Sequence, residues 1–164
     1  MKSMRALVLV SSLLLLTACG AGQNAQTAQM YTPTDGVQGE SSTIQVRNVV
    51  VVANAAGDGI LSATLVDPSD VTTTTYGAPD RLTGVIINDK AATLTPAAPT
   101  LQVNAPVNFS GPASNASAVV TALGVKPGAN VTVTFSFEIA GDLTVTALVR
   151  ENSEEFAAVT APKS

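Results

Sequence analysis

Strict alternation of apolar and polar side chains over residues 131–139 is the feature that most constrains the fold. The odd positions are Val131, Val133, Phe135, Phe137 and Ile139, and the even positions are Thr132, Thr134, Ser136 and Glu138. Successive side chains of a β-strand point to opposite faces, so this pattern predicts a strand with one buried face. The alternation resumes over residues 143–149 after a short polar break, which predicts a β-hairpin.

Parity predicts the loop of this hairpin, because residues directly opposite each other on paired strands share a face. A two-residue loop at 141–142 would place Ile139 opposite Thr144, an apolar side chain against a polar one. A three-residue loop at 140–142 keeps apolar side chains together, and we expect Gly141 or Asp142 to adopt a positive φ there. The expected pairs are Ile139 with Leu143, Phe137 with Val145, and Phe135 with Ala147.

Short strand candidates separated by Gly, Pro and Asp precede the hairpin. They lie at residues 44–52, 60–66, 81–88, 92–95, 101–103, 107–109 and 117–123. The apolar run at 49–52 predicts burial on both faces, and Gly84 predicts a bulge or a close approach. With no convincing amphipathic helix, the spacing predicts an all-β, immunoglobulin- or cupredoxin-like antiparallel β-sandwich over residues 42–150. We expect residues 151–164 to form a mobile acidic tail, with Phe156 as the one residue that could dock on the domain.

The N-terminal segment has the form of a secretory signal. Lys2 and Arg5 precede an apolar run at 6–16, which is too short to span a bilayer comfortably. The sequence LTAC at 16–19 resembles a bacterial lipobox, in which the cysteine is acylated, and Cys19 is the only cysteine in the chain. We therefore expect a signal peptide at 1–18 and a lipid anchor on Cys19 at the extracytoplasmic face of the cell membrane. The alternative is an ordinary signal peptide with a free thiol at Cys19.

Residues 20–41 are rich in Gln, Thr, Gly and Asn and show little hydrophobic periodicity. This composition predicts a flexible tether, so that the region 19–41 comprises the lipidated cysteine and a linker.

Composition argues against several classes of function. The chain has no His, which excludes Ser-His-Asp and Cys-His catalytic arrangements and removes the usual base near neutral pH. All 12 acidic residues and all but two of the 8 basic residues lie from Cys19 onward, so nucleic acid is not an expected partner. We expect no enzymatic activity, no catalytic residue, no cofactor and no metal site.

The long segment 67–80 is the candidate contact region, since structureless loops of this length are often functional. Asp67, Asp70 and Asp80 could ligate a hard cation such as Ca²⁺, but their spacing matches no known loop, and turn roles beside Pro and Gly are favoured. We expect partner contacts from Asp67, Asp70, Tyr76 and Asp80. The alternative for Tyr76 is a ring folded back over the sandwich edge.

Three stretches carry a resemblance to a known family: CGAGQNAQTAQ at 19–29, PDRLTGV at 79–85 and KPGANVTVTFSFEIAGDLTVTALV at 126–149. They resemble the LpqE-type lipoproteins of mycobacteria and corynebacteria. More distantly, DRLTGV and the final hairpin are similar to the PCu(A)C periplasmic copper chaperones, a cupredoxin-like family that binds Cu(I) with His and Met. Val119 and Thr121 stand where that family has a His-x-Met pair, so the resemblance implies that its copper site is not retained.

The LpqE-type resemblance implies a non-catalytic accessory or assembly subunit on the outer face of the actinobacterial cytochrome bcc–aa3 respiratory supercomplex. Two alternatives stay open. One is a metal-delivery protein related to PCu(A)C chaperones with a non-standard site. The other is a cell-envelope binding module for polysaccharide or lipid, which the scarcity of aromatic residues disfavours.

Overall fold

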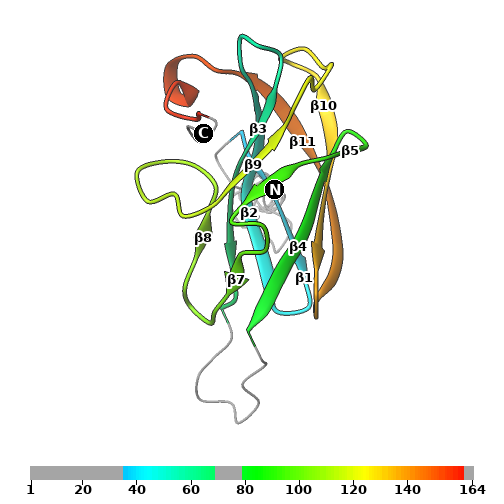
Figure 1. Ribbon diagram of the computed structural model, residues 1–164, viewed down its shortest axis with the longest axis vertical. Helices are drawn as coiled ribbons and strands as arrows, with labels where there is room; N and C mark the ends of the chain where they lie inside the picture. The colour runs from blue at the N-terminus through cyan, green and yellow to red at the C-terminus, as the bar shows by residue number, and fades with distance from the viewer. Residues whose placement is uncertain (1–34, 69–78, 161–164) are drawn as a thin grey trace, which may run out of the picture. The chain divides into compact units, whose positions relative to one another are not determined.

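The structure, a computed structural model, describes residues 35–68 and 79–160. These residues form β-strands and one short 3₁₀ helix (Figure 1). In chain order the elements are β1 (Val37–Ser41), β2 (Ile44–Ala53), β3 (Gly59–Val66), β4 (Asp80–Ile87), β5 (Lys90–Ala91), β6 (Thr93–Thr95), β7 (Thr100–Leu101), β8 (Val107–Asn108), β9 (Ser117–Val120), β10 (Asn130–Phe137), β11 (Gly141–Glu151) and η3 (Glu154–Phe156). Cys19, Asp70 and Tyr76 lie outside the described residues.

The strands form one curled, nearly closed sheet in the order β5-β4-β10-β11-β2-β3-β9-β6, with β1 paired to β2, β7 to β4 and β8 to β3. Its enclosed core includes Val46, Leu65, Leu82, Phe135 and Val149, one residue from each of five strands. The predicted all-β, cupredoxin-like fold is confirmed. One pairing departs from the expected antiparallel arrangement, because β11 runs parallel to β2 with Val149 opposite Val51.

The alternation in β10 sorts its side chains as predicted up to Phe137. Val131, Val133, Phe135 and Phe137 are buried, and the Phe135 and Phe137 rings stack with their centroids 6.4 Å apart. Ile139 breaks the pattern, since it lies beyond the strand and is 63% exposed. The expectation that Ile139 belongs to the buried face is wrong.

The hairpin closes two residues earlier than predicted. Phe137 pairs with Gly141 and Phe135 with Leu143, so the three-residue loop is 138–140 rather than 140–142. The partner of each β10 residue thereby shifts by four residues, and the face of every paired residue is unchanged because an even shift preserves parity. Gly141 has φ +79°, as expected for one of the two candidate positions. The physical reason for the earlier turn is non-local: the carboxylate of Asp80, on β4, binds the loop amides of Ile139 and Ala140.

Strand β2 is buried on both faces, as predicted for residues 49–52. Val49 and Val51 face the enclosed core, whereas Val50 and Val52 pack outside it with Ile60 and Val159. Two residues of the C-terminal segment therefore pack on the sheet: Phe156, the residue for which we allowed docking, and Val159. Val159 is only 7% exposed because it packs on the outer side of β2, where it removes the apolar side chains of Val50 and Val52 from water.

The side chain of Asn152 fastens this covering segment. Its Nδ2 atom donates to the carbonyl oxygens of Phe156, at 2.9 Å, and Val159, at 2.6 Å. Its backbone N–H donates to the carbonyl of Ala53 at the end of β2, at 3.1 Å. Asn152 thus links the two ends of the C-terminal segment to each other through its side chain, and links the segment to β2 through its backbone.

The sheet also begins before Ser42, where we expected the sandwich to start. Strand β1 pairs with β2 from Val37 onward. A Cβ on Gly39 would lie 2.9 Å from Cγ1 of Val145, so β1 approaches β11 closely at this point. The register between β4 and β10 shifts beside Gly84, between Ser136 and Phe137, which confirms the irregularity predicted at this glycine. None of the helices in the described ranges has the length and apolarity to cross a membrane.

Candidate functional site

Asp80, a predicted contact residue, is buried at the first position of β4 and is only 4% exposed. Its Oδ1 atom accepts hydrogen bonds from the backbone N–H groups of Arg81, at 2.7 Å, and Ile139, at 2.9 Å. Its Oδ2 atom accepts from the N–H of Ala140 at 2.9 Å. The carboxylate thus holds the β10–β11 loop against β4, and it is not at the surface where a partner would contact it.

Asp67, which follows the last residue of β3, is also buried. It is 5% exposed, and its backbone carbonyl accepts from the N–H of Asn104 at 2.8 Å. It also forms an isolated parallel bridge with Val103. Burial removes this second aspartate from the expected contact surface. The other two predicted contact residues, Asp70 and Tyr76, and the predicted lipidation site, Cys19, fall outside the described residues.

The loop that Asp80 holds presents Ile139 to solvent. Besides the two amide bonds to Asp80, the N–H of Glu138 donates to the carbonyl of Arg81 at 2.9 Å. On the other side of the loop, Oγ of Ser41 donates to the carbonyl of Ala140 at 2.7 Å. Three consecutive loop residues are therefore tied to β1 and β4, and Ile139 is the most exposed large apolar side chain in the described part of the chain.

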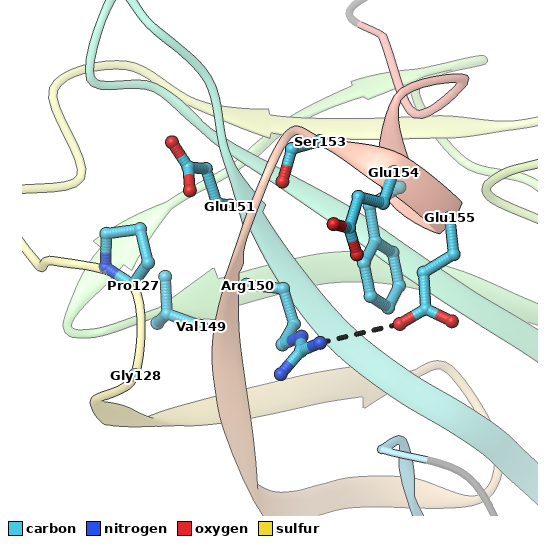
Figure 2. Close-up of a pocket in the computed structure, with 9 residues that line it drawn as sticks. Pro127, Gly128, Val149, Arg150, Glu151, Ser153, Glu154 and Glu155 are labelled. Atoms are coloured by element: carbon cyan, nitrogen blue, oxygen red, sulfur yellow. Dashed lines mark hydrogen bonds and ion pairs between the residues drawn. The ribbon is translucent and has the colours of Figure 1, made fainter.

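A shallow polar hollow of about 360 Å³ lies at the far end of β11, around Arg150. Figure 2 shows Arg150 reaching toward Glu155, with Glu151 and Glu154 on the surrounding backbone. The Nη2 atom of Arg150 lies 3.1 Å from Oδ2 of Asp35 and 3.4 Å from Oε1 of Glu155.

The Arg150 guanidinium carbon also lies 5.6 Å from the ring centroid of Phe156. Arg150 thus ties the chain before β1, through Asp35, and η3 to strand β11. Its charge is occupied by two carboxylates, so this hollow has the chemistry of a surface clamp rather than of an anion site. All three side chains are more than a third exposed, and such pairs contribute little to stability.

A second hollow of about 400 Å³ is lined by uncharged residues near the end of the described chain. They are Thr95, Pro96, Phe109, Ser110, Gly111, Ser114, Asn115, Ala116, Ser117, Ala158, Val159 and Thr160. Oγ of Ser117 is inaccessible to solvent and has no hydrogen-bond partner. The hydroxyl of Ser110 instead pairs with that of Ser62 at 2.6 Å. Nothing in this lining can transfer a proton near neutral pH or hold a soft metal.

The residues of the described domain do not fit a copper site. His, Cys and Met supply the soft and borderline ligands for copper, and residues 35–68 and 79–160 contain none of them. Val119 lies in β9, partly buried against the outer apolar cluster, and Thr121 is exposed just after the strand. Within the described residues, no three His, Cys, Asp or Glu side chains are grouped closely enough to hold a metal ion.

Sequence reasoning did not find the Asp80-held loop or the Arg150 clamp. Both depend on contacts between residues far apart in the chain, which no local pattern reports. The exposed position of Ile139 had no sequence signal, since the residue continues the alternation of β10.

Comparison with solved structures identifies similar folds. The copper-bound PCuAC domain from PmoF2 has a TM-score of 0.56 and 21% sequence identity, over 70% of this chain and 98% of that chain. The apo PCuAC domain from PmoF1 has a TM-score of 0.57 and 17% identity, over 70% and 99%. The apo PCuAC domain from PmoF2 has a TM-score of 0.54 and 19% identity, over 72% and 98%. No family model and no curated protein matches this sequence. At these identities the likeness shows a shared fold.

Proposed function

We propose that this chain is a membrane-anchored, extracytoplasmic, non-catalytic protein that acts by contact with another macromolecule. The observation that carries the proposal is the pairing of a PCuAC-like fold with a domain that has no His, Cys or Met in its described residues. If a domain has this fold but lacks the His, Cys and Met side chains that bind copper, its surface is what remains to interact with other molecules. The signal segment and Cys19 support attachment of this surface to the membrane.

The role proposed is that of an accessory or assembly subunit, and the partner is the cytochrome bcc–aa3 respiratory supercomplex. The LpqE-type resemblance at 19–29, 79–85 and 126–149 supports this assignment. Since β1 begins at Val37, a linker over residues 20–36, if it is a flexible coil, would span roughly 21–25 Å, enough to lie against the outer face of a membrane complex.

Co-purification tests the proposal directly. The full-length protein with a C-terminal tag is expressed in an actinobacterial host, membranes are extracted in mild detergent, and the tagged protein is recovered. We expect the supercomplex subunits in the eluate at near-stoichiometric amounts. A Cys19→Ala variant serves as the control for acylation, and it should carry no fatty acid and recover less of the complex. Absence of supercomplex subunits from the wild-type eluate would count against the proposal.

Copper delivery is the second candidate, and the solved neighbours favour it, since one of them is described as a copper-bound domain. Met30 is the only soft side chain that follows Cys19, so any site in this chain would rest on carboxylates, hydroxyls and backbone oxygens, which suit hard cations. Titration of the protein with Cu(I) and Cu(II) separates the two functions. Micromolar or tighter binding of either ion would favour delivery, whereas no binding leaves the contact function.

A further inference from the structure

We propose that the β10–β11 loop is the contact point of this protein, with Ile139 inserting into an apolar pocket on a protein partner. The inference rests on the proposed function and adds to it a surface and the chemistry of what that surface meets. Ile139 and Ile86 are the two exposed large apolar side chains in the described residues, at 63% and 42% exposure. Ile139 lies in a loop that is hydrogen-bonded to Asp80, whereas Ile86 lies within strand β4.

The loop around Ile139 is fixed in advance of binding. The buried Asp80 carboxylate accepts hydrogen bonds from the backbone N–H groups of two consecutive residues, Ile139 and Ala140, each at 2.9 Å. The hydroxyl of Ser41 bonds the Ala140 carbonyl from the opposite side. A loop that is already ordered loses little conformational entropy when it docks, so more of the contact energy appears as affinity.

The burial of the Asp80 carboxylate is a second feature of this loop. A buried carboxylate is costly unless it is well hydrogen-bonded, and two of the three N–H groups that bond Asp80 belong to this surface loop, the third being that of Arg81. The charged side chain of Asp80 is therefore buried, whereas the apolar side chain of Ile139 is exposed. The same hydrogen bonds that stabilise the loop fix the position in which Ile139 faces solvent.

Charge around the loop indicates the kind of partner. Glu138 and Asp142 flank Ile139 and are exposed, and Glu40 is exposed on the neighbouring β1. Arg81 is the only cation among the described residues of this loop and of the strand ends bonded to it, and its Nε lies 3.9 Å from Oε2 of Glu138. An acidic rim around an apolar centre complements an apolar pocket ringed by Lys or Arg. The same rim repels an anionic lipid surface, which favours a protein partner over the bilayer itself.

Ile86 provides a matched control within the same sheet. It is the last residue but one of β4 and lies between two paired strands, opposite Thr134 of β10 and Ala91 of β5. No hydrogen bond from its backbone to a buried carboxylate is among the contacts of this strand in the described residues. Replacing Ile86 removes a similar apolar side chain without touching the proposed contact.

Site-specific photo-crosslinking tests the inference in the full-length, membrane-bound protein. A benzophenone amino acid replaces Ile139 in one variant and Ile86 in the other, and both are irradiated in intact cells. We expect a discrete protein adduct at position 139 and none at position 86. Mapping of the crosslinked peptide should place it at an apolar site flanked by Lys or Arg.

Binding measurements with the purified partner complete the test. Ile139→Ser should raise the Kd about 10- to 100-fold, and Ile86→Ser should change it less than about 2-fold. Glu138→Lys and Asp142→Lys should weaken binding and reduce its dependence on salt, while Glu154→Lys at the other end of β11 should not. Equal thermal unfolding of Ile139→Ser and wild type excludes misfolding as the cause.

The outcomes distinguish this inference from the function beneath it. Lipid-only adducts at position 139, equal adducts at both positions, no protein adduct at position 139, or an unchanged Kd for Ile139→Ser would each overturn the contact point. If the wild-type protein still recovers the supercomplex in those cases, the proposed function stands. If it recovers nothing, both fail.

Discussion

Replacing Asp80 by Ala should unfold the β10–β11 loop and strongly destabilise the domain. The carboxylate satisfies three backbone N–H groups, two of which belong to the loop, and it is 4% exposed. Hydrogen bonds to a charged group each contribute about 1.5–3 kcal/mol. The loop amides can regain water once freed, and the amide of Arg81 is adjacent in sequence, so we take the lower part of that range for the two loop bonds. The expected loss is about 3–4 kcal/mol, a large share of the 5–15 kcal/mol typical of a domain.

Urea unfolding of purified protein, followed by circular dichroism, measures this loss. Asp80→Asn should fall between wild type and Asp80→Ala, because its amide oxygen can still accept on one side while its NH₂ group meets an N–H on the other. Asp142→Asn is the matched control, an exposed carboxylate in the same hairpin whose removal should change stability by less than about 0.5 kcal/mol. If Asp80→Ala is as stable as Asp142→Asn, the argument that this carboxylate sets the loop is refuted.

Three further predictions follow from the same structure. Phe135→Ala should cost about 3–5 kcal/mol in urea unfolding, since the ring is fully buried, whereas Thr146→Ala on the exposed face should cost less than about 0.5 kcal/mol. Gly141→Ala should cost about 1–2 kcal/mol, because Gly141 has φ +79° and a Cβ there meets no neighbour that could add a clash; a loss below 0.3 kcal/mol would contradict this. Cys19→Ala should abolish incorporation of labelled fatty acid into the protein, and a variant that is still labelled would contradict lipid anchoring at this residue.

The sequence alone predicts the faces of β10 and β11 but not their register. Alternation states which side chains are buried, and Val131 to Phe137 follow it. It does not state where the strand stops, because Ile139 satisfies the pattern equally well. The stopping point depends on Asp80, which lies 59 residues away in the chain and accepts the Ile139 amide. A register error that keeps every side chain on its face, here four residues in the partner of each β10 residue, is therefore expected when a turn is set by a distant side chain.

The sequence pointed to Asp80 but not to the loop that Asp80 holds, for a related reason. Aspartates beside Pro and Gly are typical of exposed turns, so Asp67 and Asp80 read as surface residues. In the structure both are buried, and the side chain that reaches solvent beside Asp80 is Ile139. Hydropathy predicts that aspartate is exposed and that isoleucine is buried, which is the reverse of what the structure shows at these positions. Likewise, the acidic composition of residues 151–155 gave no indication that Val159, beyond Phe156, packs over Val50, Val52 and Ile60.

The parallel pairing of β11 with β2 has a consequence for how the domain is made. Val149 and Val51 are partners although about 100 residues separate them, and long-range pairings of this kind slow folding. Strand β1 covers residues 44–49 of this edge of β2, so residues 51–53 find their partners only when β11 is present. A polypeptide that leaves the ribosome from its N-terminus therefore cannot complete this sheet until β11 has emerged.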